Sequence, residues 1–364
     1  MYKTIYPVSD HTIYERFPDQ NTSVDQILEL WPVKQGQPNE TEDYWVSTIN
    51  SRILIKFNLT EISSSINGRE FQAYLRLHAT EATNSPTSYT LYSYPLSGSI
   101  VNGTGFFNSN PEITSGVSWN YKSSKLIGER WATTNYNSNT TGSLTGGGNW
   151  YTNVSGSQAF ENDSPDVRMD VTNIVKTWLS GSISNDGFIV KYKDSDETSL
   201  QTFGHLKFFS LETHTIYIPR LEVYWDDSVV SGTGSFDEVE SDDQVLYIKN
   251  LKDIYSENEK PILRLGSRSR YPIQTYSTSS NYLIQKRLPV NTYYQIQDSV
   301  TSETVIPFSV IGTKVSCDMN GNFIKLDCSS MLPEREYHLI FKCEFADGVV
   351  NYIDQNYNFT ITRH

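Results

Sequence analysis

The residue types that most often carry out catalysis are few in this chain and far apart. None of the histidines stands in an H-E-x-x-H or H-x-H arrangement, the spacing that brings two imidazoles to one zinc ion. The sequence also lacks the G-x-S-x-G segment that presents a nucleophilic serine on a sharp turn. These patterns predict neither zinc catalysis nor serine hydrolysis. The six histidines are His11, His78, His205, His214, His338 and His364.

Paired carboxylates offer another route to hydrolysis, because a glycosidase uses two acids across a cleft. Glu42 and Asp43 lie in an expected loop, and Asp163, Asp166 and Asp170 lead into an expected helix. Acids at the start of a helix are stabilised by its dipole. Their spacing does not place two of them across a cleft, so we interpret them as loop and helix-cap acids. We predict no catalytic residue and expect that the protein is not an enzyme.

The cysteines and glycines likewise show no sequence pattern that binds a cofactor or a metal ion. The chain has only three cysteines, and Cys317 and Cys328 have the wrong spacing for a zinc ribbon. With Cys343 they predict buried thiols rather than a disulfide framework. The glycine-rich segment 142–152 lacks the Lys-Ser/Thr of a phosphate-binding loop. The loop DQNTSVD at 19–25 holds calcium-type oxygen ligands, but the pattern is unspecific. We predict no cofactor and no metal.

Three tryptophans lie in loop-rich sequence and could stack on a sugar ring. Trp119, Trp131 and Trp150 occur in GVSWNYK, GERWATT and GGNWYTN. Indole rings on a β-sandwich are suited to stacking on a glycan. The alternative is that these rings pack the loops onto the sandwich. Both interpretations remain open at this point.

We expect β-strands to position these residues. The chain is rich in Tyr, Ser and Thr, and its apolar runs are short, which is typical of strands. It has 364 residues, 37% of them hydrophobic, with 24 Tyr. In RILIKFNL the side chains alternate, so that Ile53, Ile55 and Phe57 share one face. Asn, Gly, Ser and Pro separate such runs. The pattern predicts an all-β protein, with an N-terminal jelly-roll sandwich and a small immunoglobulin-like or fibronectin-like domain.

One segment has helical spacing instead. VRMDVTNIVKTWLSG predicts a single helix of about ten residues that closes an end of the sandwich with Trp178. Asp170 or Thr172 is expected to cap its start, and Gly181 to take the left-handed conformation at its end. Its expected apolar face consists of Val171, Val175, Trp178 and Leu179.

Charge and composition divide the chain. Segment 226–243 holds seven acids and no base, whereas the last 121 residues carry 13 bases and 12 acids. All seven Trp precede it and all three Cys follow it. We predict a sandwich domain at 1–228, an acidic Gly/Ser linker at 229–243 and a C-terminal β-domain at 244–364.

The overall charge and the apolar pattern exclude several classes of partner. The net charge is −13, which disfavours binding to a phosphate backbone, so we predict no nucleic-acid partner. No stretch approaches 18 apolar residues, and we expect no membrane partner. The N-terminus lacks the apolar core of a secretory signal. The sequence therefore predicts a protein made in a reducing cytoplasm.

Residues 1 to about 225 resemble the DNRLRE-type β-sandwich, a jelly-roll module similar to some carbohydrate-binding modules. The matching pieces occur in the same order. They are TIYPVSDHTIYE, INSRILIKFNLTEIS, VSWNYKS, RWATTNYNSN with GGGNWYT, DVTNIVKTWLSGSISNDGFIVK and FFSLETHTIYIPRLEVYW. Long Asn/Ser-rich insertions such as 97–127 depart from the family, so no binding residue is carried over.

The two-domain arrangement resembles virion structural proteins of tailed bacteriophages, most clearly in SRSRYPIQTYSTSSNYLIQKRLPVNTYYQIQD and the residues that follow. In such proteins this region forms β-domains that dock on neighbouring subunits. The resemblance implies other virion proteins as partners and a multi-copy position in a symmetric particle assembled in the host cytoplasm. Arg264, Arg268, Arg270 and Tyr271 are candidate docking residues; alternatively, they form a solvated hairpin face.

These observations predict a non-enzymatic virion component at the neck, collar or tail periphery. The C-terminal domain would anchor it and the jelly roll would project. The alternative function is a glycan-binding adhesion module that contacts host surface carbohydrate through the exposed aromatic residues.

Overall fold

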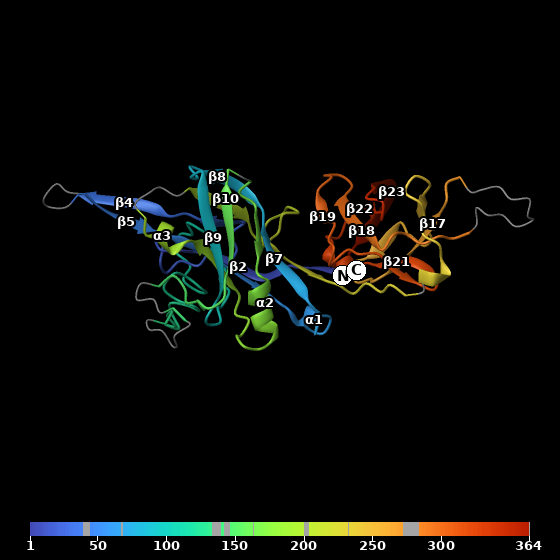
Figure 1. Cartoon of the computed structure of the whole chain (residues 1–364). Coiled ribbons are helices and arrows are strands. Elements are labelled where there is room, and N and C mark those ends of the chain that lie inside the picture. Colours follow the sequence, from blue (N-terminus) through green and yellow to red (C-terminus); the bar gives the residue numbers. More distant parts are fainter. Residues whose placement is uncertain are drawn as a thin grey trace, which may run out of the picture. The chain divides into compact units, whose positions relative to one another are not determined.

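The computed structural model describes residues 1–38, 44–66, 68–132, 140–141, 146–162, 164–199, 204–231, 233–271 and 284–363. Antiparallel strands dominate these residues, and helices are few and short (Figure 1). The prediction of an all-β sandwich protein is thereby confirmed. The helices are α1 (Thr60–Ser63), α2 (Thr172–Leu179) and α3 (Asp194–Glu197), and 3₁₀ turns occur at Thr233–Ser235 and Cys328–Ser330.

The strands alternate buried and exposed side chains wherever one face of a sheet is open, as in β7, β9 and β22. The first fourteen strands are β1 (Tyr2–Ile5), β2 (Pro7–Tyr14), β3 (Ile27–Leu30), β4 (Val33–Pro38), β5 (Tyr44–Ile49), β6 (Ser51–Phe57), β7 (Phe71–Leu77), β8 (Ala79–Thr83), β9 (Ser88–Pro95), β10 (Gly156–Glu161), β11 (Val167–Asp170), β12 (Phe188–Tyr192), β13 (His205–Phe209) and β14 (Arg220–Trp225). The remaining strands are β15 (Val245–Ile248), β16 (Ile254–Ser256), β17 (Ile262–Arg268), β18 (Asn291–Asp298), β19 (Thr304–Ile306), β20 (Ser316–Asp318), β21 (Gly321–Lys325), β22 (Arg335–Glu344) and β23 (Val350–Thr362).

Contacts divide the chain into two compact units. The N-terminal unit comprises Ile5–Ser65 and Gln72–Glu222, and the C-terminal unit comprises Met1–Thr4, Ile66–Phe71 and Val223–His364. The first residues join the C-terminal unit through charge pairs. The Met1 amino group lies 2.8 Å from the Asp227 carboxylate, and Lys3 Nζ lies 3.2 Å from Asp327. A single boundary at residue 228, as expected from sequence, therefore does not describe this division, because both ends of the chain build one unit.

The described part of the expected linker 229–243 is built into the C-terminal unit. Val230 forms a parallel bridge with Cys317, and the Val239 N–H donates to the Arg287 carbonyl at 3.0 Å. One acid of this segment also forms an ion pair, because Glu238 lies 2.5 Å from Arg287. The segment is therefore not a free linker, because its backbone and its charges find partners within the unit.

The N-terminal unit contains the sheets β10-β9-β12-β6-β2 and β3-β13-β8, the β4-β5 ribbon and most of the sheet β1-β14-β7-β11. In β6 the predicted face of Ile53, Ile55 and Phe57 is buried, as expected. Leu54, on the opposite face, is also fully buried. It belongs to a cluster with Trp119, Trp131 and Trp150, so residues of the long loops cover the second face of this sheet.

Helix α2 confirms the predicted helix and the glycine at its end, but the N-cap position is taken by Val171, between the two predicted capping residues. Trp178 is buried and its ring lies 4.5 Å from that of Phe188 on β12, so it fills the core as expected. The Thr172 N–H donates to Asp170 Oδ1 at 2.9 Å, and Gly181 has φ +74°. The helix is slightly shorter than predicted, and Ile174 is buried where Leu179 is only half-buried.

The long insertion that follows β9 is tied to the loop after β2 by one buried amide. The Asn21 side chain donates from Nδ2 to the Val117 carbonyl at 2.8 Å. Its Oδ1 accepts from the N–H groups of Ser23 at 3.2 Å and Gly105 at 3.0 Å. Gly103 packs against the same amide, where a Cβ atom would lie 2.2 Å from Asn21 Oδ1. The insertion is therefore held in a fixed conformation rather than packed only by apolar contact.

The C-terminal unit contains the sheets β15-β17-β21-β20 and β16-β23-β22-β18-β19, whose strands are close together in Figure 1. The predicted hairpin at Asn320-Gly321 is present, with Asp318 paired to Gly321. Gly321 has φ +102°, but Asn320 lies outside the left-handed region, so the turn is not the expected type I′. Cys317, Cys328 and Cys343 are buried free thiols, as predicted.

Candidate functional site

The three tryptophans proposed for glycan stacking are buried. Trp119 is 3% exposed, Trp131 2% and Trp150 9%. The Trp131 indole N–H donates to the Ser118 carbonyl at 3.0 Å. Stacking on a sugar requires a free ring face, so the prediction of a glycan site at these residues is wrong. The alternative interpretation, in which the rings pack the loops onto the sandwich, describes their surroundings.

Two of these rings enclose a buried charge cluster. The Arg52 guanidinium lies 5.0 Å from the ring centroids of both Trp119 and Trp150. Arg52 Nε and Nη2 donate to the two oxygens of Glu197 at 3.0 and 2.7 Å, and Lys191 Nζ lies 2.8 Å from Glu197. Lys191 is 1% exposed. Glu197 therefore lies between two cations, and Asp194 supplies the second carboxylate because it also pairs with Lys191.

Asp10 and His11 on β2 are buried titratable groups. Burial raises the pKa of Asp10 to about 7, against a hydrogen bond of 2.7 Å that its Oδ2 accepts from the Leu211 N–H. The Glu212 charge also raises this pKa. Burial lowers the pKa of His11 to about 4. Both groups are therefore held neutral near pH 6, as groups within a packed sheet rather than as a proton-transfer pair.

We expect Asp10→Asn to remove a pH dependence of stability. Between pH 5 and about pH 7 the folded Asp10 still binds a proton that the unfolded chain has lost, so the free energy of unfolding falls as the pH rises and levels off above that pKa. For Asp10 the fall is about 2 to 3 kcal/mol over this range. The contribution of His11 has the opposite sign and cancels when wild type and variant are compared. Urea unfolding at pH 5 and pH 8 measures the difference, and a constant difference would contradict the assignment.

The other acids considered from sequence have structural partners. Asp166 Oδ1 accepts from the Ala79 N–H at 2.8 Å, and Asp170 caps α2. Asp19 lies 2.6 Å from Lys125, and the Asp25 oxygens accept from the Phe107 N–H. Glu42, Asp43 and Asp163 lie outside the described residues.

Among the described residues, no group of three or more His, Cys, Asp and Glu side chains is arranged to hold a metal ion. In the same part of the chain, no helix has the length and apolar character to cross a membrane.

The four predicted docking residues do not form one continuous surface. The Arg264 guanidinium pairs with Asp318 at 2.7 Å and lies over the Phe323 ring at 4.7 Å, so it stabilises the sheet itself. Arg268 donates to the carbonyl of Ser269 at 2.9 Å. Arg270 is exposed and lines a groove, and Tyr271 is 76% exposed. Arg268, Arg270 and Tyr271 remain candidate contact residues.

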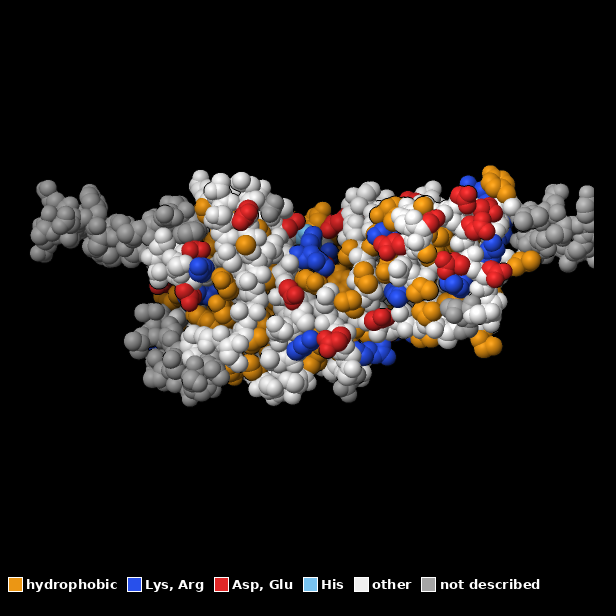
Figure 2. Space-filling model, in the orientation of Figure 1, with side chains coloured by type: hydrophobic (Ala, Val, Ile, Leu, Met, Phe, Trp, Pro, Cys, Tyr) orange, Lys and Arg blue, Asp and Glu red, His pale blue; other side chains and the backbone are white. Residues whose placement is uncertain are grey.

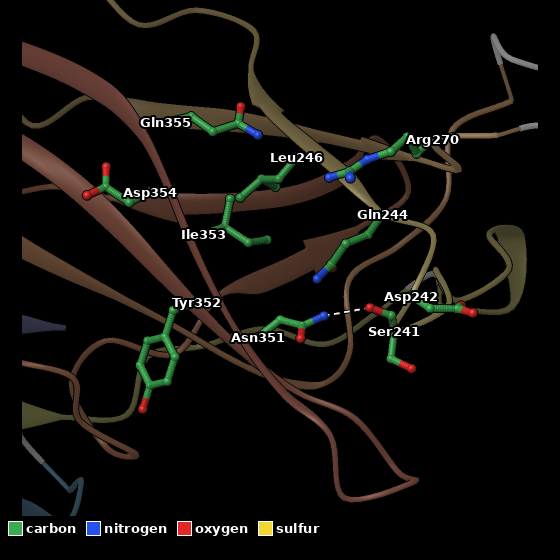
Figure 3. A pocket seen from close by; sticks show the side chains of 10 residues that line it. All are labelled: Ser241, Asp242, Gln244, Leu246, Arg270, Asn351, Tyr352, Ile353, Asp354 and Gln355. Atoms are coloured by element: carbon green, nitrogen blue, oxygen red, sulfur yellow. Dashed lines mark hydrogen bonds between the residues drawn. The ribbon is translucent and has the colours of Figure 1, made fainter.

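The groove that Arg270 lines is an open cavity of the C-terminal unit, with a volume of about 300 Å³. We call it the β23 groove, because half of its lining comes from β23. Figure 3 shows Gln244 in its middle, with Arg270 and Tyr352 toward its ends. The lining residues are Ser241, Asp242, Gln244, Leu246, Arg270, Asn351, Tyr352, Ile353, Asp354 and Gln355.

The segment opposite β23 in the groove is joined to this strand by side-chain hydrogen bonds rather than by a strand ladder. Asn351 Nδ2 donates to the Ser241 carbonyl at 2.6 Å. Farther along β23, the Tyr357 hydroxyl donates to the Leu246 carbonyl at 2.8 Å. Between them, the described residues contain no strand ladder on this side of β23, because β16 pairs only with Thr360–Thr362 at its far end. The edge of β23 therefore forms one wall of the groove.

The backbone of β23 also contributes to the groove wall. The Phe345 N–H donates to the Val349 carbonyl at 2.9 Å, so these two residues form a hydrogen-bonded pair of the β22–β23 ladder. Hydrogen-bonded and non-hydrogen-bonded pairs alternate along an antiparallel ladder, and residues of β23 in the non-hydrogen-bonded pairs turn their N–H and C=O groups away from β22. Val350, Tyr352 and Asp354 are these residues. The sequence did not reveal this site, because polar residues interrupt the apolar alternation of NYIDQNYNFT that would mark a strand.

Exposed apolar side chains concentrate in the C-terminal unit. Of nineteen exposed large hydrophobic residues in the described part of the chain, fourteen lie in this unit. On the face drawn in Figure 2, hydrophobic and charged side chains are interspersed. The fourteen are Val229, Val230, Tyr247, Ile254, Ile262, Tyr271, Ile284, Val290, Val300, Val310, Met319, Val349, Val350 and Tyr352.

Comparison with known proteins gives no relative: the chain matches no family model and no curated protein.

Proposed function

We propose that the chain is a non-enzymatic structural component of a bacteriophage virion, at the neck, collar or tail periphery. In this proposal the C-terminal unit docks on other virion proteins, and the N-terminal unit projects as a jelly-roll module of the DNRLRE type. In this proposal the C-terminal unit has an immunoglobulin-like or fibronectin-like fold and serves as the docking domain. The protein is present in several copies in a symmetric particle.

The concentration of exposed apolar side chains in the C-terminal unit is the observation that carries this proposal. A surface that mixes Val, Ile and Tyr with charged residues is suited to a protein–protein interface, in which an apolar centre is ringed by polar contacts. Tyr271 and Arg268 combine the two residue types that contribute most binding energy at interfaces. The sequence resemblance to virion proteins covers the same unit.

Incorporation into particles tests the proposal. The chain, tagged and expressed during infection by the phage that encodes it, is expected in purified particles at a constant copy number by quantitative mass spectrometry. The double change Arg268→Glu with Tyr271→Ala is expected to lower incorporation at least about tenfold, the effect of losing about 1.4 kcal/mol of binding.

A matched control lies in the other unit, where Leu126 is 88% exposed and Ile127 68%. Changing both to alanine is expected to leave incorporation unchanged, because the N-terminal unit projects. Absence of the chain from purified particles would refute the proposal. Normal incorporation of the C-terminal variant, or loss with the N-terminal variant, would place docking elsewhere.

A further inference from the structure

Three arginines of the N-terminal unit gather on one face of the sheet β1-β14-β7-β11, and we call them the arginine cluster. Arg220 lies on β14, Arg76 on β7 and Arg168 on β11, and β7 lies between the other two strands. Arg76 and Arg168 are direct cross-strand partners, so their side chains leave the same face of the sheet. Like charges placed opposite each other destabilise an antiparallel pair, so this pairing requires negative charge nearby.

Glu222 is a carboxylate that two members of the cluster share. Its Oε2 accepts from Arg168 Nε and its Oε1 from Arg220 Nε, both at 3.3 Å. The Glu222 side chain is 4% exposed and that of Arg220 9%, whereas the Arg168 side chain is 39% exposed. One negative charge thus serves two guanidinium groups, and the one that reaches solvent is Arg168.

Two further acids flank Arg168 along the chain, and both bond elsewhere. Asp166 Oδ1 accepts from the Ala79 N–H at 2.8 Å, and Asp170 Oδ1 accepts from the Thr172 N–H at 2.9 Å. The structure therefore directs these carboxylates to backbone groups rather than to the arginine cluster.

Arg76 is the member of the cluster that lacks a counter-charge. Its side chain is half-buried, its Nε is buried, and it forms no ion pair or hydrogen bond in the described part of the chain. A buried donor without an acceptor destabilises the folded chain. Burial first, and then the charges of Arg220 and Arg76, lower the pKa of His78 to about 4. The positive charges of the cluster therefore act together on one part of the sheet.

The Arg168 guanidinium is held in place before any ligand binds. Its Cζ lies 4.0 Å from the centroid of the Tyr74 ring, and its Nε is bonded to Glu222. Tyr74 lies two residues before Arg76 on β7, so it shares the face of the sheet with Arg76. A group that is already oriented loses little freedom on binding, which favours affinity.

We propose that Arg76 and Arg168 bind a doubly charged tetrahedral oxyanion, a phosphate or a sulfate group, on this face of the sheet. Three guanidinium groups and Glu222 leave two positive charges, which a dianion balances. The oxygens of such a group accept from the parallel N–H groups of arginine, and they supply Arg76 with the acceptor that it lacks. A carboxylate would balance only one of the two charges. This inference does not depend on the docking proposal.

Isothermal titration calorimetry on the full chain tests this inference. The probes are sodium phosphate and sodium sulfate, each added in exchange for sodium chloride so that the ionic strength stays constant. At least one of them is expected to bind with a Kd of about 1 mM or tighter. Binding of phosphate alone would identify a phosphate group and binding of sulfate alone a sulfate group, and either result supports the site.

Replacing Arg76 tests the assignment directly. Arg76→Gln is expected to raise the Kd at least about tenfold, because it removes one of the two charges. Arg76→Lys keeps the charge but loses the planar fork, and it is expected to bind more tightly than Arg76→Gln. In chloride alone, the Tm of Arg76→Gln is expected to equal or exceed that of wild type, because the change removes a cation that faces Arg168.

The matched control is Arg130→Gln in the same unit. Arg130 is exposed and donates to the Tyr121 hydroxyl at 3.1 Å, away from the cluster, so its loss is expected to leave binding unchanged. The proposal is overturned if neither anion binds, if Arg76→Gln binds as tightly as wild type, or if Arg130→Gln weakens binding equally. A lower Tm of Arg76→Gln in chloride would contradict the unpaired state of Arg76 and overturn it as well.

Discussion

Replacing Glu197 with alanine is expected to lower the free energy of unfolding of the N-terminal unit by about 3 to 5 kcal/mol. The carboxylate accepts two hydrogen bonds from Arg52 and lies 2.8 Å from Lys191. Its removal leaves two cations in a site where Lys191 is 1% exposed and the Arg52 side chain 12%. Lys191 keeps its pair with Asp194, and Arg52 Nη1 keeps its hydrogen bond to the Gly147 carbonyl at 2.6 Å, so the loss is expected at the lower end of this range.

Thermal unfolding followed by calorimetry measures this effect. For a unit of this size, 1 kcal/mol lowers the Tm by about 2 to 4 °C, so the transition should fall by roughly 10 °C. The matched control is Asp196→Ala on the same short helix, where the half-buried carboxylate accepts a hydrogen bond from the neighbouring Ser195 at 3.0 Å. It should change stability by less than about 0.5 kcal/mol.

A double-mutant cycle separates the ion pair from simple loss of packing. With Arg52→Ala in the background, Glu197→Ala should cost less than in wild type, because one of the two stranded cations is already gone. If Glu197→Ala costs no more than Asp196→Ala, the charge cluster does not stabilise the unit and the argument fails.

Local features of the fold could be predicted from sequence where a short segment determines its own structure. The helix around Trp178 has its cap at Asp170 and its left-handed glycine at Gly181 because both signals act within one turn of the helix. The alternation of β6 was predictable for the same reason. The burial of Leu54 was not, because the tryptophans that cover it, Trp119, Trp131 and Trp150, lie in loops far along the chain.

Of the two interpretations of the tryptophans, the structure bears out packing onto the sandwich, for a related physical reason. Loop-rich sequence around Trp119 and Trp150 favours surface positions, but Arg52 and Lys191 offer cationic groups on which both rings can pack. An aromatic face and a desolvated cation stabilise one another. Only the fold brings β6, β12 and the two loops together, so no local pattern could show it.

The acidic segment 229–243 differs from its predicted linker role because it has long-range contacts. Its composition is that of a linker, yet Glu238 meets Arg287 and Val239 is buried. The β23 groove was missed because its residues come from 241–246, 270 and 351–355, which no spacing connects. Sequence therefore predicted the fold class and one helix, whereas the candidate site emerged only from long-range contacts.

The second large effect is expected at Asn21, whose replacement by alanine should cost about 3 kcal/mol. The side chain is fully buried and satisfies the N–H of Gly105 and the carbonyl of Val117. Each group left unpaired in a buried site costs about 1 to 3 kcal/mol. Because both groups belong to the long insertion after β9, the loss should loosen that insertion before the sheets unfold. Limited proteolysis should cut Asn21→Ala between residues 97 and 131 faster than wild type.

A variant at Gly103 tests the same contact from the other side. A Cβ atom there would lie 2.1 Å from the Ser115 carbonyl oxygen and 2.2 Å from Asn21 Oδ1, so Gly103→Ala must displace backbone. It should increase cleavage of the insertion as Asn21→Ala does, and the two changes together should cost less than the sum of their separate effects. Asn58→Ala is the control, since Asn58 is an exposed asparagine that accepts from the Thr60 N–H at 3.0 Å. If the control and Asn21→Ala are cleaved alike, the buried amide does not hold the insertion, and its other contacts, such as those of Asp19 with Lys125 and of Asp25 with the Phe107 N–H, are sufficient.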